Sequence, residues 1–86
     1  MHEMSIAFEV CRLAEERVGA GDLPHVVKVG LEVGDLSGIE SGALEFWLEV
    51  LLAEPPFSGA CPVIERSAGD ALCLTYVEIE DGSPEN

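Results

Sequence analysis

The first three residues, Met1, His2 and Glu3, bring four nitrogen atoms within reach of a single metal ion. These are the terminal amine, the His2 imidazole and the amide nitrogens of His2 and Glu3, which can surround an ion in one plane once the amides lose their protons. Square-planar nitrogen ligation suits Ni(II) or Cu(II) and suits zinc poorly. The Met1 amine must be neutral to bind, and its ordinary pKa of about 8 makes binding pH-dependent. Taken alone, a histidine at position two is also compatible with an ordinary exposed terminus.

The three cysteines, Cys11, Cys61 and Cys73, form no CxxC pair. An odd number without close spacing predicts neither a disulfide framework nor the usual zinc site. Cys11 lies beside the apolar stripe of the first expected helix, where packing is the first interpretation and redox or metal chemistry the alternative. Cys61 and Cys73 fall on two strands expected to be hairpin neighbours. They could meet there and bind a soft metal, although packing is again the simpler interpretation.

Five further residues have a structural interpretation beside a functional one: His25, Glu45, Trp47, Glu49 and Glu54. We expect the histidine to lie on the surface at the start of a strand, and the tryptophan to face the core or else a partner. The three glutamates form a solvated acidic edge that could steer a basic partner. The sequence shows no Ser/His/Asp arrangement, phosphate-binding loop or pair of buried carboxylates. We therefore expect no catalytic residues and no enzymatic activity.

The composition predicts a small, acidic globular domain. A chain of 86 residues can form one modest core but no deep, walled active site. Its 17 acidic and 4 basic residues give a net charge of −13, which nucleic-acid phosphates and anionic membranes would repel. The longest apolar run is interrupted by Glu49 and is far shorter than the ~20 residues of a membrane span. No signal peptide is visible, so we expect a reduced, cytoplasmic setting.

Two amphipathic helices are expected, over residues 4–18 and from about residue 40 or 41 to residue 53. Apolar residues recur at spacings of three and four in both segments, which is typical of one buried helical face. Gly19 and Gly21 favour the end of the first helix, and Pro55 and Pro56 end the second. Ser37 and Glu40 could form a capping box before the second helix, although Gly38 between them weakens this interpretation.

Three strands are expected, over residues 25–34, 60–66 and 72–80. The first alternates apolar and polar residues, and Pro62 places the second at a sheet edge or strand start. The predicted fold class is α+β in the order α-β-α-β-β, with two helices packed on a three-stranded sheet. We expect the last two strands to form an antiparallel hairpin because few residues join them. Residues 1–80 would be a single domain, and residues 81–86 a polar C-terminal tail.

The opening residues and a strand-turn block together resemble one known family. The segment MHEMSI at residues 1–6 is similar to the opening of the hydrogenase nickel-insertion accessory proteins of the HypA/HybF family. The segment VGLEVGDLSGIE at residues 29–40 resembles that family's first strand and following turn. The similarity extends through residues 43–50, 60–65 and 71–80, so nearly the whole chain is covered.

The resemblance implies a nickel-binding metallochaperone for maturation of a nickel enzyme such as [NiFe]-hydrogenase. In that family Ni(II) is held by the terminal amine, the histidine imidazole and backbone nitrogens of the opening tripeptide. These roles carry over to Met1, His2 and Glu3 here. Glu3 would bind the ion through its amide nitrogen, and its carboxylate would contact the ligands without binding the ion. The alternative keeps the fold without the metal, as a protein-interaction module in hydrogenase maturation or assembly.

The sequence departs from the family pattern at one point. Family members carry a zinc ribbon with two CxxC pairs between the last two strands, whereas here only residues 67–71 join these strands. We therefore expect nickel but no zinc, and docking to the usual maturation GTPase is in doubt. The expected partners are a nickel-enzyme precursor or that GTPase. A homodimer formed through the edge strand that carries Pro62 is a further possibility.

Overall fold

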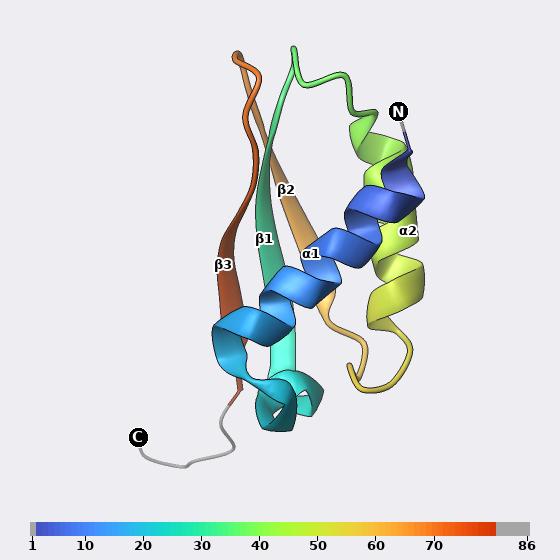
Figure 1. Ribbon diagram of the computed structural model, residues 1–86, viewed down its shortest axis with the longest axis vertical. Coiled ribbons are helices and arrows are strands. Elements are labelled where there is room, and N and C mark those ends of the chain that lie inside the picture. Colours follow the sequence, from blue (N-terminus) through green and yellow to red (C-terminus); the bar gives the residue numbers. More distant parts are fainter. Residues whose placement is uncertain (1, 81–86) are drawn as a thin grey trace.

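Two α-helices, one 3-10 helix and three strands make up the fold (Figure 1). The computed structural model describes residues 2–80; Met1 and residues 81–86, where the polar tail was expected, lie outside the described part. The elements in chain order are α1 (Glu3–Val18), the 3-10 helix η1 (Ala20–His25), β1 (Val26–Gly34), α2 (Ser41–Leu52), β2 (Cys61–Ser67) and β3 (Leu72–Ile79). The α+β class and the order α-β-α-β-β are confirmed.

The strand β1 lies at the centre of the sheet, whose order is β2-β1-β3. It pairs in parallel with β2, after the crossover through α2, and antiparallel with β3. The expected hairpin between the last two strands is therefore wrong, because β1 lies between them. The chain from Ser67 to Leu72 can reach ~17 Å at ~3.5 Å per residue, which exceeds the ~10 Å across two strand spacings. The short connection can thus pass over the end of β1.

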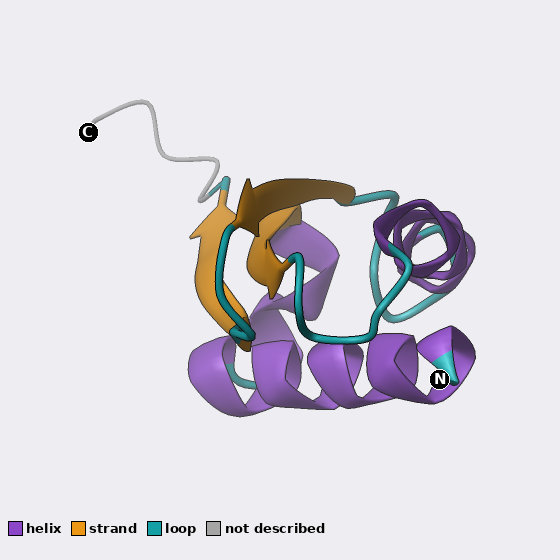
Figure 2. Cartoon of the chain, turned by 90° about the horizontal axis from the view of Figure 1, so that it is seen from above, coloured by secondary structure: helices purple, strands orange, loops and turns teal. Residues whose placement is uncertain are grey.

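Both α-helices cover the same face of the sheet (Figures 1 and 2). In the view from above, α1 runs along one side of this layer and α2 packs beside its N-terminal part (Figure 2). A Cβ at Gly30 in β1 would overlap the aromatic ring of Tyr76 in β3, so this ring lies against the central strand at a position that only glycine allows. The expected helix-on-sheet arrangement is confirmed.

Each helix buries one stripe of side chains, as its sequence predicts. In α1 the stripe ends before Gly19, whose φ of 87° is readily adopted only by glycine. In α2 the stripe is widened by Trp47, which is partly buried and packs against the core as expected. Neither helix among the described residues is long and apolar enough to cross a membrane. The fully buried leucines of α2 and the small residues of α1 are Leu44, Leu48, Leu52, Ala7 and Ala14.

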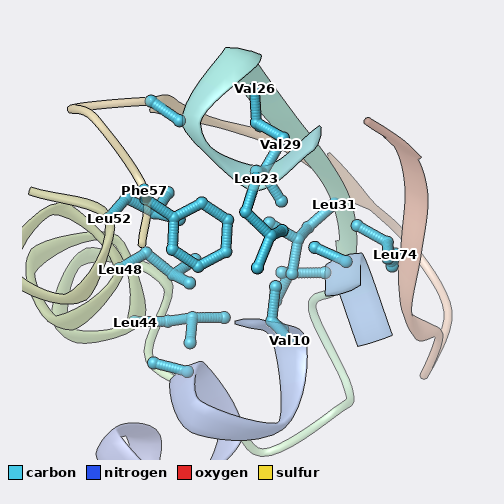
Figure 3. Close-up of a cluster of buried hydrophobic side chains, with 14 residues drawn as sticks. Val10, Leu23, Val26, Val29, Leu31, Leu44, Leu48, Leu52, Phe57 and Leu74 are labelled. Atoms are coloured by element: carbon cyan, nitrogen blue, oxygen red, sulfur yellow. The ribbon is translucent and has the colours of Figure 1, made fainter. Parts of the chain in front are cut away.

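The core also takes two residues from outside the expected helices and strands. Leu23 in η1 is 2% exposed, and Phe57, between α2 and β2, is 7% exposed (Figure 3). Pro24 follows Leu23 inside the same 3-10 helix. These two side chains close the core at the end of the sheet away from the loop between β1 and α2. The core members labelled in the figure are Val10, Leu23, Val26, Val29, Leu31, Leu44, Leu48, Leu52, Phe57 and Leu74.

Candidate metal centre

His2 is the N-cap of α1, and its exposed side chain makes no capping hydrogen bond. Its carbonyl accepts a hydrogen bond from the N–H of Ile6 at 3.1 Å, so the first turn of the helix is formed. The first N–H groups of an α-helix have no intrahelical carbonyl to bind. The amides of His2 and Glu3 are thus placed where a metal ion could replace their protons. Met1, which would supply the amine, lies outside the described residues.

The side chain of Glu3, the first residue of α1, reaches the start of α2. Its Oε2 accepts a hydrogen bond from the N–H of Glu40 at 3.0 Å. This hydrogen bond, together with one from the N–H of Glu3 itself, lowers the pKa of the Glu3 carboxyl group below its usual value. The carboxylate is therefore charged at neutral pH, and it fixes the beginning of α1 against the loop before α2.

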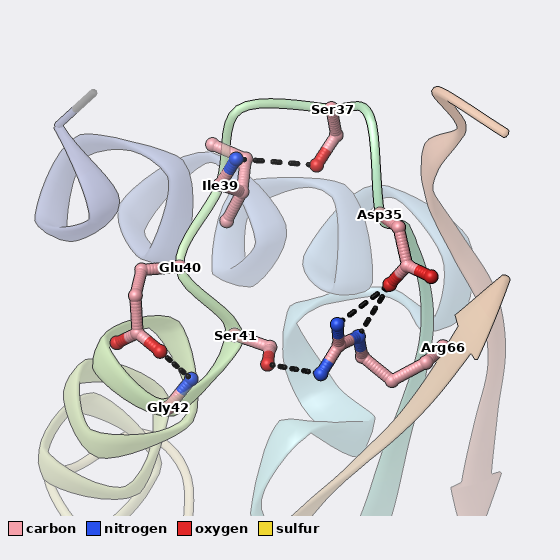
Figure 4. Close-up of polar contacts among 7 residues, drawn as sticks. All are labelled: Asp35, Ser37, Ile39, Glu40, Ser41, Gly42 and Arg66. Carbon is pink, nitrogen blue, oxygen red and sulfur yellow. Dashed lines mark hydrogen bonds and ion pairs between the residues drawn. The ribbon is translucent and has the colours of Figure 1, made fainter. Parts of the chain in front are cut away.

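Glu40 is the N-cap of α2 and serves both helices. Its N–H donates to the Glu3 carboxylate, while its own carboxylate accepts a hydrogen bond from the N–H of Ala43 at 2.7 Å. The same carboxylate accepts a hydrogen bond from the N–H of Gly42 at 3.2 Å (Figure 4). The capping box with Ser37 is wrong, since the Ser37 hydroxyl accepts from the N–H of Ile39 instead. Sequence analysis missed the link to Glu3 because no local pattern relates residues so far apart.

Arg66, near the end of β2, ties the same loop to the sheet. Its Nε and Nη2 donate to one carboxylate oxygen of Asp35 at 3.0 and 2.6 Å, and its Nη1 lies 3.5 Å from the hydroxyl of Ser41 (Figure 4). The N–H of Asp35 also donates to the carbonyl of Ser67 at the end of β2, and the N–H of Leu36 donates to the carbonyl of Gly69 in the β2–β3 connection. The loop that holds Glu3 is thus anchored at its other end to this connection.

The cysteines and His25 are not brought together. Cys61 of β2 lies opposite Lys28, and Cys73 of β3 lies opposite Glu32. Because β1 separates the two strands, the expectation that these cysteines meet is wrong. Cys11 is partly buried, and burial raises the pKa of its thiol to about 11. His25 is exposed, as expected, but it ends η1 and does not start the strand, which begins at Val26. Within residues 2–80 no three His, Cys, Asp or Glu side chains converge to hold a metal ion.

The expected donor set at the start of α1 consists of nitrogen atoms only. One imidazole and successive backbone nitrogens are the ligands that Ni(II) and Cu(II) accept in a plane. The acidic residues Glu45, Glu49 and Glu54 are exposed, as the solvated edge predicts. None of them converges on His2 as a cluster of ligands.

Comparison with known proteins relates the whole described chain to one family. Residues 1–81 match the family described as hydrogenase/urease nickel incorporation, metallochaperone, hypA. The chain is 41% identical over 75 residues to the hydrogenase maturation factor HypA of Geobacter metallireducens, covering 87% of this chain and 66% of that protein. It is 38% identical over 74 residues to HypA of Cupriavidus necator, covering 86% of this chain and 62% of that protein.

A third relative is covered more fully. HypA of Rhodobacter capsulatus is 39% identical over 83 residues, with 93% of this chain and 74% of that protein covered. The chain spans slightly less than two thirds of the length of the first two relatives. With its residues matched almost from end to end, the chain belongs to the HypA family of nickel-incorporation metallochaperones.

Proposed function

We propose that this chain binds Ni(II) and delivers it during maturation of a nickel enzyme such as [NiFe]-hydrogenase. The observation that carries the proposal is the start of α1 at Glu3, immediately after an exposed His2, in a chain of the nickel-incorporation family. The ligands would be the Met1 amine, the His2 imidazole and the amide nitrogens of His2 and Glu3. The hydrogenase maturation factors among its relatives support the choice of client.

The proposed role is to carry the ion, with no catalysed reaction. A site at an exposed helix terminus allows a partner to approach the ion directly, which suits a carrier that must release its cargo. The partner would be a nickel-enzyme precursor or a maturation GTPase in the cytoplasm. We expect no bound zinc, because residues 68–71, which join β2 to β3, contain no cysteine. Metal analysis of the purified protein would test this point.

Calorimetric titration of Ni(II) into protein with a native N-terminus tests the nickel site. We expect one site near neutral pH, with weaker binding as the pH falls and the Met1 amine becomes protonated. His2→Ala, or one residue added before Met1, should abolish binding. His25→Ala is the matched control, because His25 is also exposed but lies at the end of η1. Nickel binding that survives both changes at the terminus would contradict the proposed ligands.

The same variants separate the carrier from a metal-free interaction module. Partner capture from cells that depends on nickel and on His2 supports the carrier. Capture that is unaffected by His2→Ala, in a protein that binds no nickel, would favour the module instead.

A further inference from the structure

An apolar groove lies between α1 and the end of α2. Its volume is about 300 Å³, and it is lined by Phe8 and Cys11 of α1 and by Leu51, Glu54, Pro55 and Phe57 on or after α2. Phe57 forms its floor, since it belongs to the buried core (Figure 3). We call this feature the α1–α2 groove.

Large apolar side chains remain exposed along the groove. Phe8 is 56% exposed, and Met4, one helical turn earlier on the same face of α1, is 44% exposed. On α2, Val50 is 39% exposed and precedes Leu51, which lines the groove. Apolar side chains that gather on two adjacent helices without cover are typical of an interaction surface.

The charges around the groove are mainly acidic. Glu54 is the charged residue of the lining, and Glu15 follows Cys11 by one turn along α1. Arg12 follows Phe8 by one turn, but it pairs with Glu9 and Glu16. The chain carries 17 acidic residues against 4 basic ones, and none of the basic ones lines the groove. Those basic residues are Arg12, Arg17, Lys28 and Arg66.

The basic residues on or near α1 are also engaged elsewhere. Arg12 pairs with Glu9 and Glu16. The guanidinium of Arg17 lies 3.4 Å from the carbonyl oxygen of Leu74 in β3. Glu54 has no ion-pair partner within residues 2–80, so a basic side chain of a partner protein could pair with it.

We propose that the α1–α2 groove docks an amphipathic segment of a partner protein, with apolar side chains flanked by lysine or arginine. A second copy of this chain fits poorly, because it would bring another net charge of −13 against the first. Phe8 follows Glu3 by five residues on α1, or ~7.5 Å along the helix axis. A partner bound over Phe8 could therefore extend along α1 towards the tripeptide, and its part in nickel transfer rests on the proposed function.

A pair of synthetic peptides tests the docking itself. The probe is a capped amphipathic helix of leucine and lysine, and the control peptide has glutamate in place of lysine. Titrated into the isotope-labelled full chain, the lysine peptide should shift the amide signals of Phe8, Cys11, Leu51 and Phe57. The glutamate peptide should leave them unchanged.

Two variants separate docking in the groove from general attraction to an acidic protein. Phe8→Ser should weaken binding at least about tenfold, as expected for the central aromatic side chain of an interface. Leu36→Ser is the matched control, because Leu36 is 75% exposed but lies in the loop between β1 and α2, outside the groove lining. Glu54→Lys, a change at an exposed residue that preserves the fold, should also weaken binding.

Other results would overturn the inference. These are equal binding by Phe8→Ser and wild type, shifts spread over the open face of the sheet, or a dimer that dissociates on Phe8→Ser. His2→Ala separates the inference from the proposed function. That variant should lose nickel and keep the peptide, whereas Phe8→Ser should keep nickel and lose the peptide.

Discussion

The carboxylate of Glu3 accepts a hydrogen bond from the N–H of Glu40 at 3.0 Å, joining the first residue of α1 to the N-cap of α2. Glu40 uses its own carboxylate to cap α2, so the two helices begin at one shared point. Arg66 holds the far end of the same loop through Asp35. The position of the proposed nickel ligands thus depends on contacts with residues distant in the sequence.

Replacing Glu3 should loosen this shared point without removing the nickel ligands. Glu3→Ala removes the acceptor of the Glu40 N–H, so amide exchange at Glu40 should become faster than in the wild type. Glu3→Gln retains a carbonyl oxygen and should preserve most of the protection. Nickel stoichiometry should stay unchanged in both variants, because the proposed ligand is the amide of Glu3. Exchange measured by NMR at Glu40 checks the prediction, with Glu45→Ala as the control on exposed α2 surface.

Gly34 should tolerate no larger residue. A Cβ there would overlap the carbonyl group of Gly69 and the backbone nitrogen of Ala71, which are backbone atoms that cannot rotate away. Gly34→Ala should therefore lower the free energy of unfolding by about 1–3 kcal/mol, the usual cost of overpacking. Gly21→Ala is the matched control, since a Cβ at Gly21 meets nothing within 4 Å. Urea unfolding should show a change of no more than about 0.5 kcal/mol for the control.

Leu48 should be among the core residues whose truncation lowers the free energy of unfolding most. Its side chain is 0% exposed, so Leu48→Ala leaves a cavity and should cost about 2–5 kcal/mol of unfolding free energy. Leu36→Ala removes the same atoms from a side chain that is 75% exposed and should cost less than about 0.5 kcal/mol. Equal costs in thermal unfolding would show that Leu48 is not packed as described.

The sequence predicts the elements of this fold well, because each depends on a local pattern. The alternation around Val29 and Leu31 and the helical spacing of Leu44 and Leu48 identify buried faces that the structure confirms. The order of the strands cannot be predicted from local patterns, since it depends on which strand buries most apolar surface when it pairs on both sides. β1 is buried along most of its length, whereas β2 and β3 are half-buried or exposed at most positions, in agreement with the central place of β1. Pro62 on β2 is at a sheet edge, as its missing N–H predicts.

The candidate site divides in the same way. The ligating tripeptide is contiguous, so residue type and family resemblance are enough to propose it. The groups that hold it come from elsewhere: the N–H of Glu40, and Arg66 behind it. Every residue except proline has a backbone N–H, and therefore no sequence pattern indicates that the N–H of Glu40 binds Glu3. Only the packing of α1 against α2 brings these groups together.

The three thiols should differ in reactivity. Cys61 and Cys73 are exposed, so a thiol reagent at pH 8 should modify them first, whereas Cys11 should react slowly.

Cys11 should also make the stability of the fold depend on pH. Burial raises the pKa of Cys11 to about 11, above the value of about 8.5 in an unfolded chain. The folded state therefore holds this proton more tightly, and its contribution to stability is present below about pH 8.5 and lost as the pH rises towards 11. From pH 8 to pH 10 the urea midpoint of unfolding should fall further for the wild type than for Cys11→Ser, which cannot ionise at this position. An equal fall in both proteins would show that Cys11 is not desolvated.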